Sequence, residues 1–440
     1  MCMIGCKFIF IFSFMHKALR LYLSFLARMI VRKHKPYIIG VTGTVGKTTM
    51  TQNIAILLRT AFGNDAVEIS KYNYNGEFGL PLSIIGSKTG GKNLWLWAKV
   101  GWHAIRRYFH SYPRYLILEY GIDTPGEMDF LLSIAHPDIA IITPVEPNHI
   151  EQFQEFSKYK KEKLKILAYA KKYIVHESLR ENVPVNTPLY GFSHQENMQI
   201  QDIHTTSSGT SAQIVCDDEV YTVEYPSIGT FLIENLLPII YISQKMKIPK
   251  EKITQSMKSM IIKNGRGKLL EGINGSVIID GSYNGGSLSI RKGLESLSDF
   301  LETKKITLVL GDMRELGGQT QNLHDKLADD IIRIFSAYPK TKIYLVGPYM
   351  KEYVFPKLQG YFDVKFSFSS RAVGEYVKSY SDQISEDDMF YVKGSQNTIF
   401  LEEAIKYWIS PDQYKYLPRQ GGEWDEKKQV FFSSVRQDIE

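Results

Sequence analysis

Residues 43–49 have the composition of a loop that binds the phosphates of a nucleotide. They read Gly43-Thr44-Val45-Gly46-Lys47-Thr48-Thr49 and stand between an apolar run at 37–41 and a helical pattern at 48–61. Glycines let the backbone curl so that its N–H groups face phosphate oxygens, and the start of the helix adds a favourable dipole. Lys47 would neutralise charge on the phosphates, and the Thr48 hydroxyl would bind Mg²⁺. The strict pattern has glycine where Val41 stands, but the strand-to-helix setting favours ATP binding over a plain glycine-rich turn.

Strands and helices alternate around this loop and again later in the chain. Apolar runs typical of buried strands lie at 115–119, 139–143, 277–280, 306–310, 342–346 and 389–392. Such alternation predicts parallel sheets covered by helices on both faces. We therefore expect an α/β protein, with a P-loop ATPase-type central domain and a C-terminal Rossmann-like α/β domain. The polar, alternating stretch at 200–225 predicts a small antiparallel insertion.

Four segments are expected along the chain. They are a basic amphipathic N-terminal segment at 1–35, the ATP-binding domain at 36–263, the C-terminal domain at 264–412 and a polar tail at 413–440. Three cysteines, Cys2, Cys6 and Cys216, are too few and too scattered for a disulfide framework or a four-cysteine zinc site. This cysteine usage favours the reducing cytoplasm.

The net positive charge of the chain comes from its first 36 residues. The sequence has 53 Lys and Arg against 47 Asp and Glu, a formal net charge of +6. Residues 1–36 hold seven basic residues and no acidic one, so the remainder is nearly neutral. A nucleic-acid-binding protein would carry this charge on its folded domain, which argues against nucleic acid as a partner.

The basic N-terminal segment has two interpretations. Its apolar run, 8–15, is too short to span a membrane, which takes about 20 apolar residues. Polar and basic side chains at 17, 20, 24, 28 and 32 recur at helical spacing and predict an amphipathic helix. Such a helix suits an anionic membrane surface, or its apolar face packs on the next domain. The Trp-rich segment 94–109 also suits membrane contact, although a partly buried helix with extended basic side chains is the more usual structure.

Several motifs, in order between about residues 36 and 406, together resemble those of the Mur ligases, which join amino acids or peptides to cell-wall precursors. Besides the phosphate loop they are Asn73-Tyr74-Asn75-Gly76-Glu77-Phe78-Gly79-Leu80-Pro81, Glu119-Tyr120-Gly121, Asn148-His149-Ile150-Glu151, Gly265-Arg266, Asp280-Gly281-Ser282-Tyr283-Asn284, Gly311-Asp312-Met313-Arg314-Glu315-Leu316-Gly317 and Lys393-Gly394-Ser395. The Asp312–Gly317 and Ser282–Asn284 segments point to the branch that adds D-alanyl-D-alanine to a peptidoglycan precursor.

The resemblance implies an ATP-dependent ligase that makes an amide bond through an acyl phosphate, which an amine then attacks. It places two Mg²⁺ ions at Thr48, Glu119, His149 and Lys163. Lys163 stands fourteen residues after His149, the position that the family carbamylates. Carbamylation would turn a repelling ammonium into an anionic oxygen ligand. Each residue also has a plainer interpretation, such as a loop histidine for His149 and a solvated helix lysine for Lys163.

The same resemblance assigns further site residues. The expected catalytic residues are Lys47, His149, Lys163 and Arg266. Nucleotide contacts are expected from Gly43, Thr44, Gly46, Lys47, Thr48, Thr49, Asn235, Arg266, Asp280, Tyr283 and Asn284. The substrates are expected to contact Asn73, Asn75, Asp312, Glu315, Lys393 and Ser395. Several of these residues also have a structural alternative. Asp312 and Glu315 could cap a helix, Tyr283 could be an ordinary aromatic residue of a turn, and Lys393 and Ser395 could be turn residues.

The sequence departs from the family where substrates are recognised. Only about 35 residues precede the ATP domain, where the branch carries a UDP-sugar domain. Phe231-Leu232 replaces a His-Asn pair, Gly285-Gly286-Ser287 replaces Ala-Asn-Pro, and Gln396 replaces an Arg. Three hypotheses stay open: the usual cell-wall precursor as acceptor, a different acceptor linked to the membrane, or a membrane-recruited nucleotide-binding partner with little ligase activity. We expect a monomer in the cytoplasm, with peripheral contact between residues 1–35 and the inner face of the cell membrane as an alternative.

Overall fold

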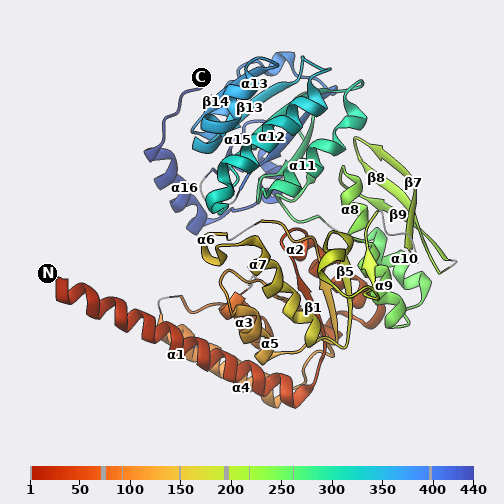
Figure 1. Cartoon of the computed structure of the whole chain (residues 1–440), viewed down its shortest axis with the longest axis vertical. Helices are drawn as coiled ribbons and strands as arrows, with labels where there is room; N and C mark the ends of the chain where they lie inside the picture. Colours follow the sequence, from red (N-terminus) through yellow and green to blue (C-terminus); the bar gives the residue numbers. More distant parts are fainter. Residues whose placement is uncertain are drawn as a thin grey trace. The chain divides into compact units, whose positions relative to one another are not determined.

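The computed structural model describes residues 2–70, 76–91, 93–147, 150–192, 198–217, 219–260, 262–395 and 399–440, with the backbone alone described for 2–15 and Leu94. The chain divides into two compact units, each shown as part of the ribbon in Figure 1. The first unit contains Met1–Val145, Gln152–Gln195 and Leu237–Ser259, and the second contains Glu146–Glu151, Glu196–Leu236 and Met260–Glu440. The domain limits at residues 36, 264 and 413 stay a prediction.

The first unit is built on a parallel sheet of six strands. The strands are β1 (Tyr37–Thr42), β2 (Val67–Ile69), β3 (Tyr115–Glu119), β4 (Ile139–Ile142), β5 (Lys172–His176) and β6 (Leu189–Tyr190), in the order β2-β3-β1-β4-β5-β6. β1 lies between β3 and β4, and its side chains are almost wholly buried. Continuous apolar runs form such strands because both faces of a parallel sheet are covered.

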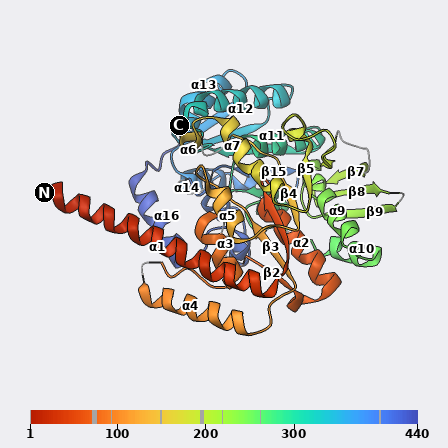
Figure 2. The ribbon, with the colours of Figure 1, turned by 60° about the horizontal axis from the view of Figure 1, so that its bottom comes forward.

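The helices of the first unit cover this sheet. They are α1 (Cys2–His34), α2 (Lys47–Phe62), α3 (Gly76–Ile85), α4 (Leu94–Phe109), α5 (Glu127–Ile134), α7 (Phe156–Leu164), α9 (Leu237–Lys245) and α10 (Lys250–Lys258), and the short α6 (Ile150–Phe153) lies where the chain passes between the units. α1, α3, α4 and α5 share one hydrophobic core with β3 and β4. Figure 2 shows α4 lying alongside α1.

The polar stripe expected on the N-terminal segment is exposed only in part, at Lys17 and Arg32. Ser24 is buried, and Arg20 pairs with Glu77 at 3.0 Å and lies 3.8 Å from the centre of the Phe130 ring. Leu21 and Phe25 are exposed instead, at 64% and 61%. The second interpretation, that the apolar face packs on the next domain, is confirmed for Leu23, Leu26 and Ile30, which are buried in the core of the first unit. The helix is nevertheless apolar on two sides, and sequence periodicity does not say which side packs on the core. None of the helices formed by the described residues is long and apolar enough to cross a membrane.

The second unit contains a mixed sheet of six strands with helices on both faces. The strands are β10 (Lys268–Glu271), β11 (Val277–Gly281), β12 (Lys305–Gly311), β13 (Lys342–Val346), β14 (Asp363–Ser367) and β15 (Asp388–Lys393), in the order β10-β11-β15-β12-β13-β14. Only the edge strand β10 is antiparallel to its neighbour. The helices are α8 (Thr230–Glu234), α11 (Ser287–Ser296), α12 (Thr320–Phe335), α13 (Phe355–Leu358), α14 (Ser370–Lys378), α15 (Glu402–Ile405) and α16 (Gly422–Ser434). The predicted α/β fold with two sheet domains is confirmed.

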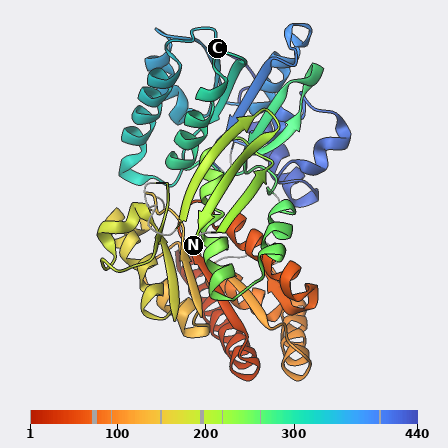
Figure 3. The ribbon, with the colours of Figure 1, turned by 90° about the vertical axis from the view of Figure 1, so that its right-hand side faces the viewer.

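A small antiparallel sheet also belongs to the second unit, and Figure 3 shows its three strands side by side. The strands are β7 (Met198–Thr206), β8 (Gly209–Cys216) and β9 (Glu219–Tyr225). Burial alternates along β8, as expected for a sheet with one face on a core. The predicted insertion at 200–225 is therefore confirmed.

Candidate functional site

The phosphate loop joins the end of β1 to the start of α2, as the sequence predicts. Gly43 and Gly46 have φ values of +135° and +87°, where residues with a side chain are strained. A Cβ on Gly43 would overlap the Thr143 hydroxyl at the end of β4. The Thr44 N–H donates to the Pro144 carbonyl at 2.8 Å, which ties the loop to the segment after β4. The loop is thus held open by its neighbours in the sheet.

Lys47 lies over this loop. Its ammonium donates to the carbonyls of Gly43 and Thr44 at 3.0 and 3.2 Å. These bonds keep the positive charge beside the backbone that would surround a phosphate. A nucleotide phosphate would attract the same ammonium.

Thr48 and Glu119 form a polar pair beside the loop. The Thr48 hydroxyl, in the first turn of α2, donates to the Glu119 carboxylate at the end of β3, at 3.2 Å. Among the described residues, no group of three or more His, Cys, Asp or Glu could hold a metal ion. Nucleotide-bound Mg²⁺ needs only one or two protein ligands, because phosphates and waters supply the others. The pair therefore fits a Mg²⁺ held together with a nucleotide.

Lys163 is buried, with 1% of its surface exposed. Burial lowers the pKa of its ammonium well below the usual range, and the positive charge of Lys47 lowers it further, whereas Asp123 and Glu119 oppose this shift. The side chain lies 4.6 Å from the centre of the Tyr159 ring. The interpretation as a solvated helix lysine was wrong, because this turn of α7 packs inward.

Glu162, which sequence reasoning missed, explains why α7 turns Lys163 inward. Its buried carboxylate accepts the N–H groups of Gly126 and Met128, at the start of α5, at 3.0 and 3.1 Å. It also pairs with Lys165 at 2.8 Å. An acidic side chain at a helix start is favourable, but a charged run such as residues 160–165 gives no sign that one of its members has this role.

Asp280, Gly265 and Tyr283 form a compact turn in the second unit. The buried Asp280 carboxylate accepts the N–H of Gly265 at 3.0 Å and both the N–H and hydroxyl of Ser282, at 3.0 and 2.6 Å. Burial raises the pKa of Asp280 to about 6. The Arg266 guanidinium lies 4.8 Å from the centre of the Tyr283 ring. Four of the predicted nucleotide residues, Arg266, Asp280, Tyr283 and Asn284, therefore lie in or next to this turn. A fifth, Asn235, lies at the end of α8, where its side chain donates to the Phe231 carbonyl at 3.1 Å.

Arg419 completes this turn from the C-terminal segment. It donates to the carbonyls of Ser282 and Tyr283, and it pairs with the buried Glu402. Lys428 of α16 also pairs with Glu402, at 3.0 Å, and with its neighbour Glu403, at 2.9 Å. The polar tail therefore packs on the second unit, a role that its loss of periodicity did not reveal.

Lys393 and Ser395 meet the segments around Asn284 and Asp312. The Lys393 ammonium donates to the Asn284 carbonyl at 2.9 Å, and burial lowers the pKa of Lys393 to about 8. The Ser395 hydroxyl accepts the Arg314 N–H at 3.0 Å. Asp312 is buried and accepts the Met350 N–H at 2.9 Å, while Glu315 is exposed. Of the two interpretations of Asp312, this contact favours the capping one.

Three predicted site residues lie outside the described residues. They are Asn73, Asn75 and His149, and Gln396 also lies there. The other predicted residues fall into two groups, one in each unit.

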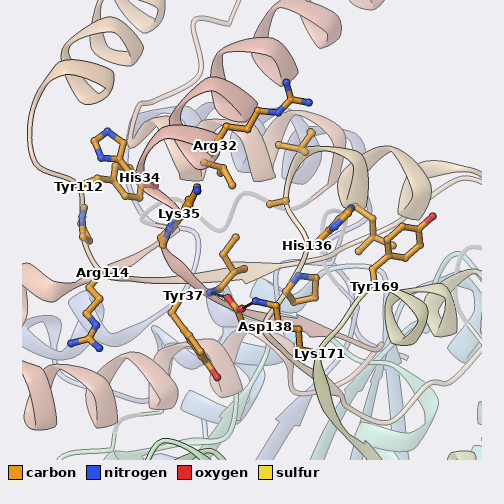
Figure 4. Close-up of a pocket in the computed structure, with 18 of the residues that line it drawn as sticks. Arg32, His34, Lys35, Tyr37, Tyr112, Arg114, His136, Asp138, Tyr169 and Lys171 are labelled. Atoms are coloured by element: carbon orange, nitrogen blue, oxygen red, sulfur yellow. Dashed lines mark hydrogen bonds and ion pairs between the residues drawn. The ribbon is translucent and has the colours of Figure 1, made fainter.

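A hollow of about 910 Å³ lies at the opposite edge of the first sheet from the phosphate loop. Its lining includes the residues that precede β3, β4 and β5, namely Arg114, Asp138 and Lys171. Figure 4 shows Lys171 beside Asp138, a pair that is 2.7 Å apart. Ligands of parallel α/β sheets bind at the carboxyl ends of the strands, and this hollow lies at the amino ends. It contains none of the predicted site residues.

Known proteins are similar to the chain in sequence and in fold. Residues 41–242 match the Mur ligase middle domain. The chain is 24% identical over 392 residues to UDP-N-acetylmuramoyl-tripeptide–D-alanyl-D-alanine ligase of Bacillus subtilis, covering 87% of this chain and 78% of that protein. It is 25% identical to the enzyme of that name from Rickettsia prowazekii, over 85% and 78% of the two chains.

Solved structures agree with this similarity at the level of the fold. The MurF ligase of Thermotoga maritima, solved in complex with ADP, superposes with a TM-score of 0.71 at 20% identity, covering 88% of this chain and 83% of that one. MurF of Acinetobacter baumannii also gives 0.71, at 18% identity over 88% and 80%.

Proposed function

We propose that the chain is a Mur ligase, an ATP-dependent ligase that forms an amide bond through an acyl phosphate, and the match of residues 41–242 to the Mur ligase middle domain supports this. The proposed amine is D-alanyl-D-alanine, and the proposed acceptor is a UDP-linked muramoyl-tripeptide precursor of peptidoglycan. The names of the Bacillus and Rickettsia relatives support this choice. The observation that carries the proposal is the phosphate loop with the Thr48–Glu119 pair beside it.

In this proposal the loop binds the phosphates of ATP. Its backbone N–H groups and the start of α2 would hold the phosphate oxygens. The Lys47 ammonium would give up its hydrogen bonds to the two loop carbonyls and donate to phosphate oxygens instead. Thr48 and Glu119 would hold Mg²⁺. When bound, this ion supplies positive charge for the phosphoryl group that is transferred.

Lys163 is proposed to be carbamylated and, with His149, to hold a second Mg²⁺. Its neutral amine would attack the carbon of CO₂, forming the N–C bond and releasing one proton. Burial supports this step, because it favours the neutral amine over the ammonium. The carbamate would be an anion near the positive charge of Lys47.

Residues of the second unit are proposed to contact the rest of the nucleotide and the amine substrate. Arg266 would contact phosphates, and Tyr283, Asn284 and Asn235 would contact the nucleoside. Asp280 would act by holding the turn that carries Tyr283, as its three hydrogen bonds suggest. Lys393 and Ser395 would bind the carboxylate of the incoming amine, and Asn73, Asn75 and Glu315 are further proposed substrate contacts.

A membrane-linked acceptor is the second candidate. The exposed apolar side chains of α1, including Leu21 and Phe25, favour it, because they suit contact with lipid. We propose that residues 1–35 make peripheral contact with the inner face of the cell membrane. We also propose that the protein acts there as a monomer.

The test is an assay of the full chain with ATP, Mg²⁺, UDP-linked muramoyl tripeptide and D-alanyl-D-alanine, measuring phosphate release and the mass of the product. Turnover that needs both substrates supports the first candidate. Turnover with a lipid-linked precursor, but not with the UDP-linked tripeptide, supports the second candidate. Nucleotide binding without turnover on either acceptor, with bicarbonate supplied for Lys163, would contradict the proposed ligase.

A further inference from the structure

Exposed large hydrophobic side chains gather on α1 and α4. Trp95, Trp102 and Phe109 of α4 are 79%, 69% and 72% exposed, and Leu21 and Phe25 of α1 exceed 60%. Single exposed apolar residues are ordinary, but a contiguous patch of them marks a surface that binds something.

Five exposed apolar residues of α4 form one stripe. Trp95, Ala98, Trp102, Ile105 and Phe109 recur at alternating spacings of three and four, and all five are exposed. This spacing places side chains on one face of a helix. The other side of α4 is already used, since Val100 and Ala104 are buried in the core of the first unit. The expectation that this segment is a partly buried helix is confirmed.

α1 has the same two-sided character. Leu23, Ala27 and Ile30 are buried in the core that receives Val100 and Ala104 of α4. Leu21 and Phe25 lie four residues apart and face solvent. Their side of α1 is therefore free of the core.

The two stripes lie on the same side of the first unit. α1 and α4 run side by side, because a Cβ on Gly101 would overlap the Tyr22 hydroxyl, and the Lys33 ammonium lies 4.1 and 5.0 Å from the centres of the Tyr108 and Phe109 rings. Each helix buries its opposite side in one shared core. The exposed stripes consequently form one ridge that points away from this core, along the helix pair seen in Figure 2.

The charged residues of α1 and α4 are all basic. Neither α1 nor α4 contains an Asp or a Glu. Lys17, Arg32 and Lys33 of α1 and Lys99 and Arg106 of α4 are exposed. A bilayer surface that contains anionic lipid complements this pattern, since basic residues contact its phosphates and Trp residues prefer the interface. A second copy of the chain does not, because two basic ridges would repel each other.

We propose that α1 and α4 together form a docking surface for an anionic lipid bilayer. Trp95, Trp102 and Phe109 of α4 enter the headgroup layer beside Leu21 and Phe25 of α1. The exposed lysines and arginines pair with lipid phosphates at its edge. The contact is peripheral and does not depend on the ligase reaction.

Flotation of the full chain with vesicles tests this surface. We expect binding to phosphatidylcholine vesicles that contain phosphatidylglycerol, weaker binding to phosphatidylcholine alone, and weaker binding at high salt. Trp95→Ser with Trp102→Ser should weaken partitioning by roughly tenfold or more. Lys99→Glu with Arg106→Glu should abolish the preference for anionic lipid.

Val430→Ser is the matched control, because Val430 is 71% exposed on α16 of the second unit, and it should leave partitioning unchanged. Circular dichroism and ATP binding of each variant check that it is folded. The proposal is overturned if the folded wild-type chain does not bind either vesicle or if the Trp variants bind as the wild type does. Concentration-dependent dimers that the Trp variants abolish, without vesicle binding, would identify the ridge as an interface between copies instead.

Discussion

The Thr48 hydroxyl donates a hydrogen bond of 3.2 Å to the Glu119 carboxylate. It connects the first turn of α2 with the carboxyl end of β3, so a helix that begins at a phosphate loop and a neighbouring strand place two oxygen ligands together. In the part of the chain that the structure describes, no group of three or more His, Cys, Asp or Glu could hold a metal ion. The arrangement suits an ion that a nucleotide brings with it.

Replacing Glu119 by Gln tests this pair, because the amide retains the size and an oxygen acceptor but loses the charge. We expect ligase turnover to fall by about 100-fold or more, with a higher Mg²⁺ requirement and an unchanged melting temperature. Glu155→Gln is the control, since Glu155 is an exposed carboxylate of the same unit. Equal rates for wild type and Glu119→Gln across a Mg²⁺ titration would rule out the metal role.

The carbamylation of Lys163, and with it the ligase activity, should depend on CO₂ and on pH. The lowered pKa favours the neutral amine that reacts with CO₂, and the carbamate is lost as the pH falls and the amine is protonated. Activity should therefore rise with added bicarbonate and decline at low pH. Carbon-13 NMR with labelled bicarbonate should show a carbamate signal in the wild type and in the control Lys161→Met, whose lysine is exposed, but not in Lys163→Met. A carbamate signal retained by Lys163→Met would refute the assignment.

Gly43→Ala should damage the phosphate loop. The new methyl group would overlap Thr143, and alanine is strained at a φ of +135°. We expect a loss of about 1–3 kcal/mol in the free energy of unfolding, together with weaker ATP binding by calorimetry. Gly360→Ala has open space around its Cβ and serves as the control. Wild-type affinity and stability in Gly43→Ala would mean that the loop does not need this glycine.

Lys428→Met should destabilise the second unit, because it leaves Glu402 and Glu403 buried beside fewer positive charges. Urea denaturation should show a loss of about 3–5 kcal/mol. Although burial alone would raise it, bonds to Lys406 and Lys428 lower the pKa of Glu403 to about 2. The stabilisation from this group is thus present above its unfolded pKa and is lost as the pH falls through about 2. Lys427 is the exposed neighbour, so Lys427→Met should change the free energy of unfolding little. Equal losses of stability in the two variants would show that the buried ion pairs contribute nothing specific.

The sequence allowed prediction of those features that follow from local pattern. β1, the phosphate loop and α2 have glycines and a lysine at fixed spacing, and the buried strands are continuous apolar runs. The burial of Lys163 was not predictable, because it depends on Glu162 reaching the start of α5, which lies more than thirty residues earlier. Likewise, the burial of Arg419 and Lys428 depends on their pairing with Glu402 and Glu403. In α1, the exposed and the buried apolar faces look alike in the sequence.

Isotope transfer tests the central claim, a ligase that works through an acyl phosphate, most directly. The acceptor carboxylate is labelled with ¹⁸O, the full chain is incubated with ATP, Mg²⁺ and D-alanyl-D-alanine, and the released phosphate is analysed by mass spectrometry. Because phosphorylation makes a carboxylate oxygen the bridge to phosphorus, amide formation should leave one ¹⁸O in each phosphate released. Phosphate released without ¹⁸O while the amide product accumulates would contradict the account.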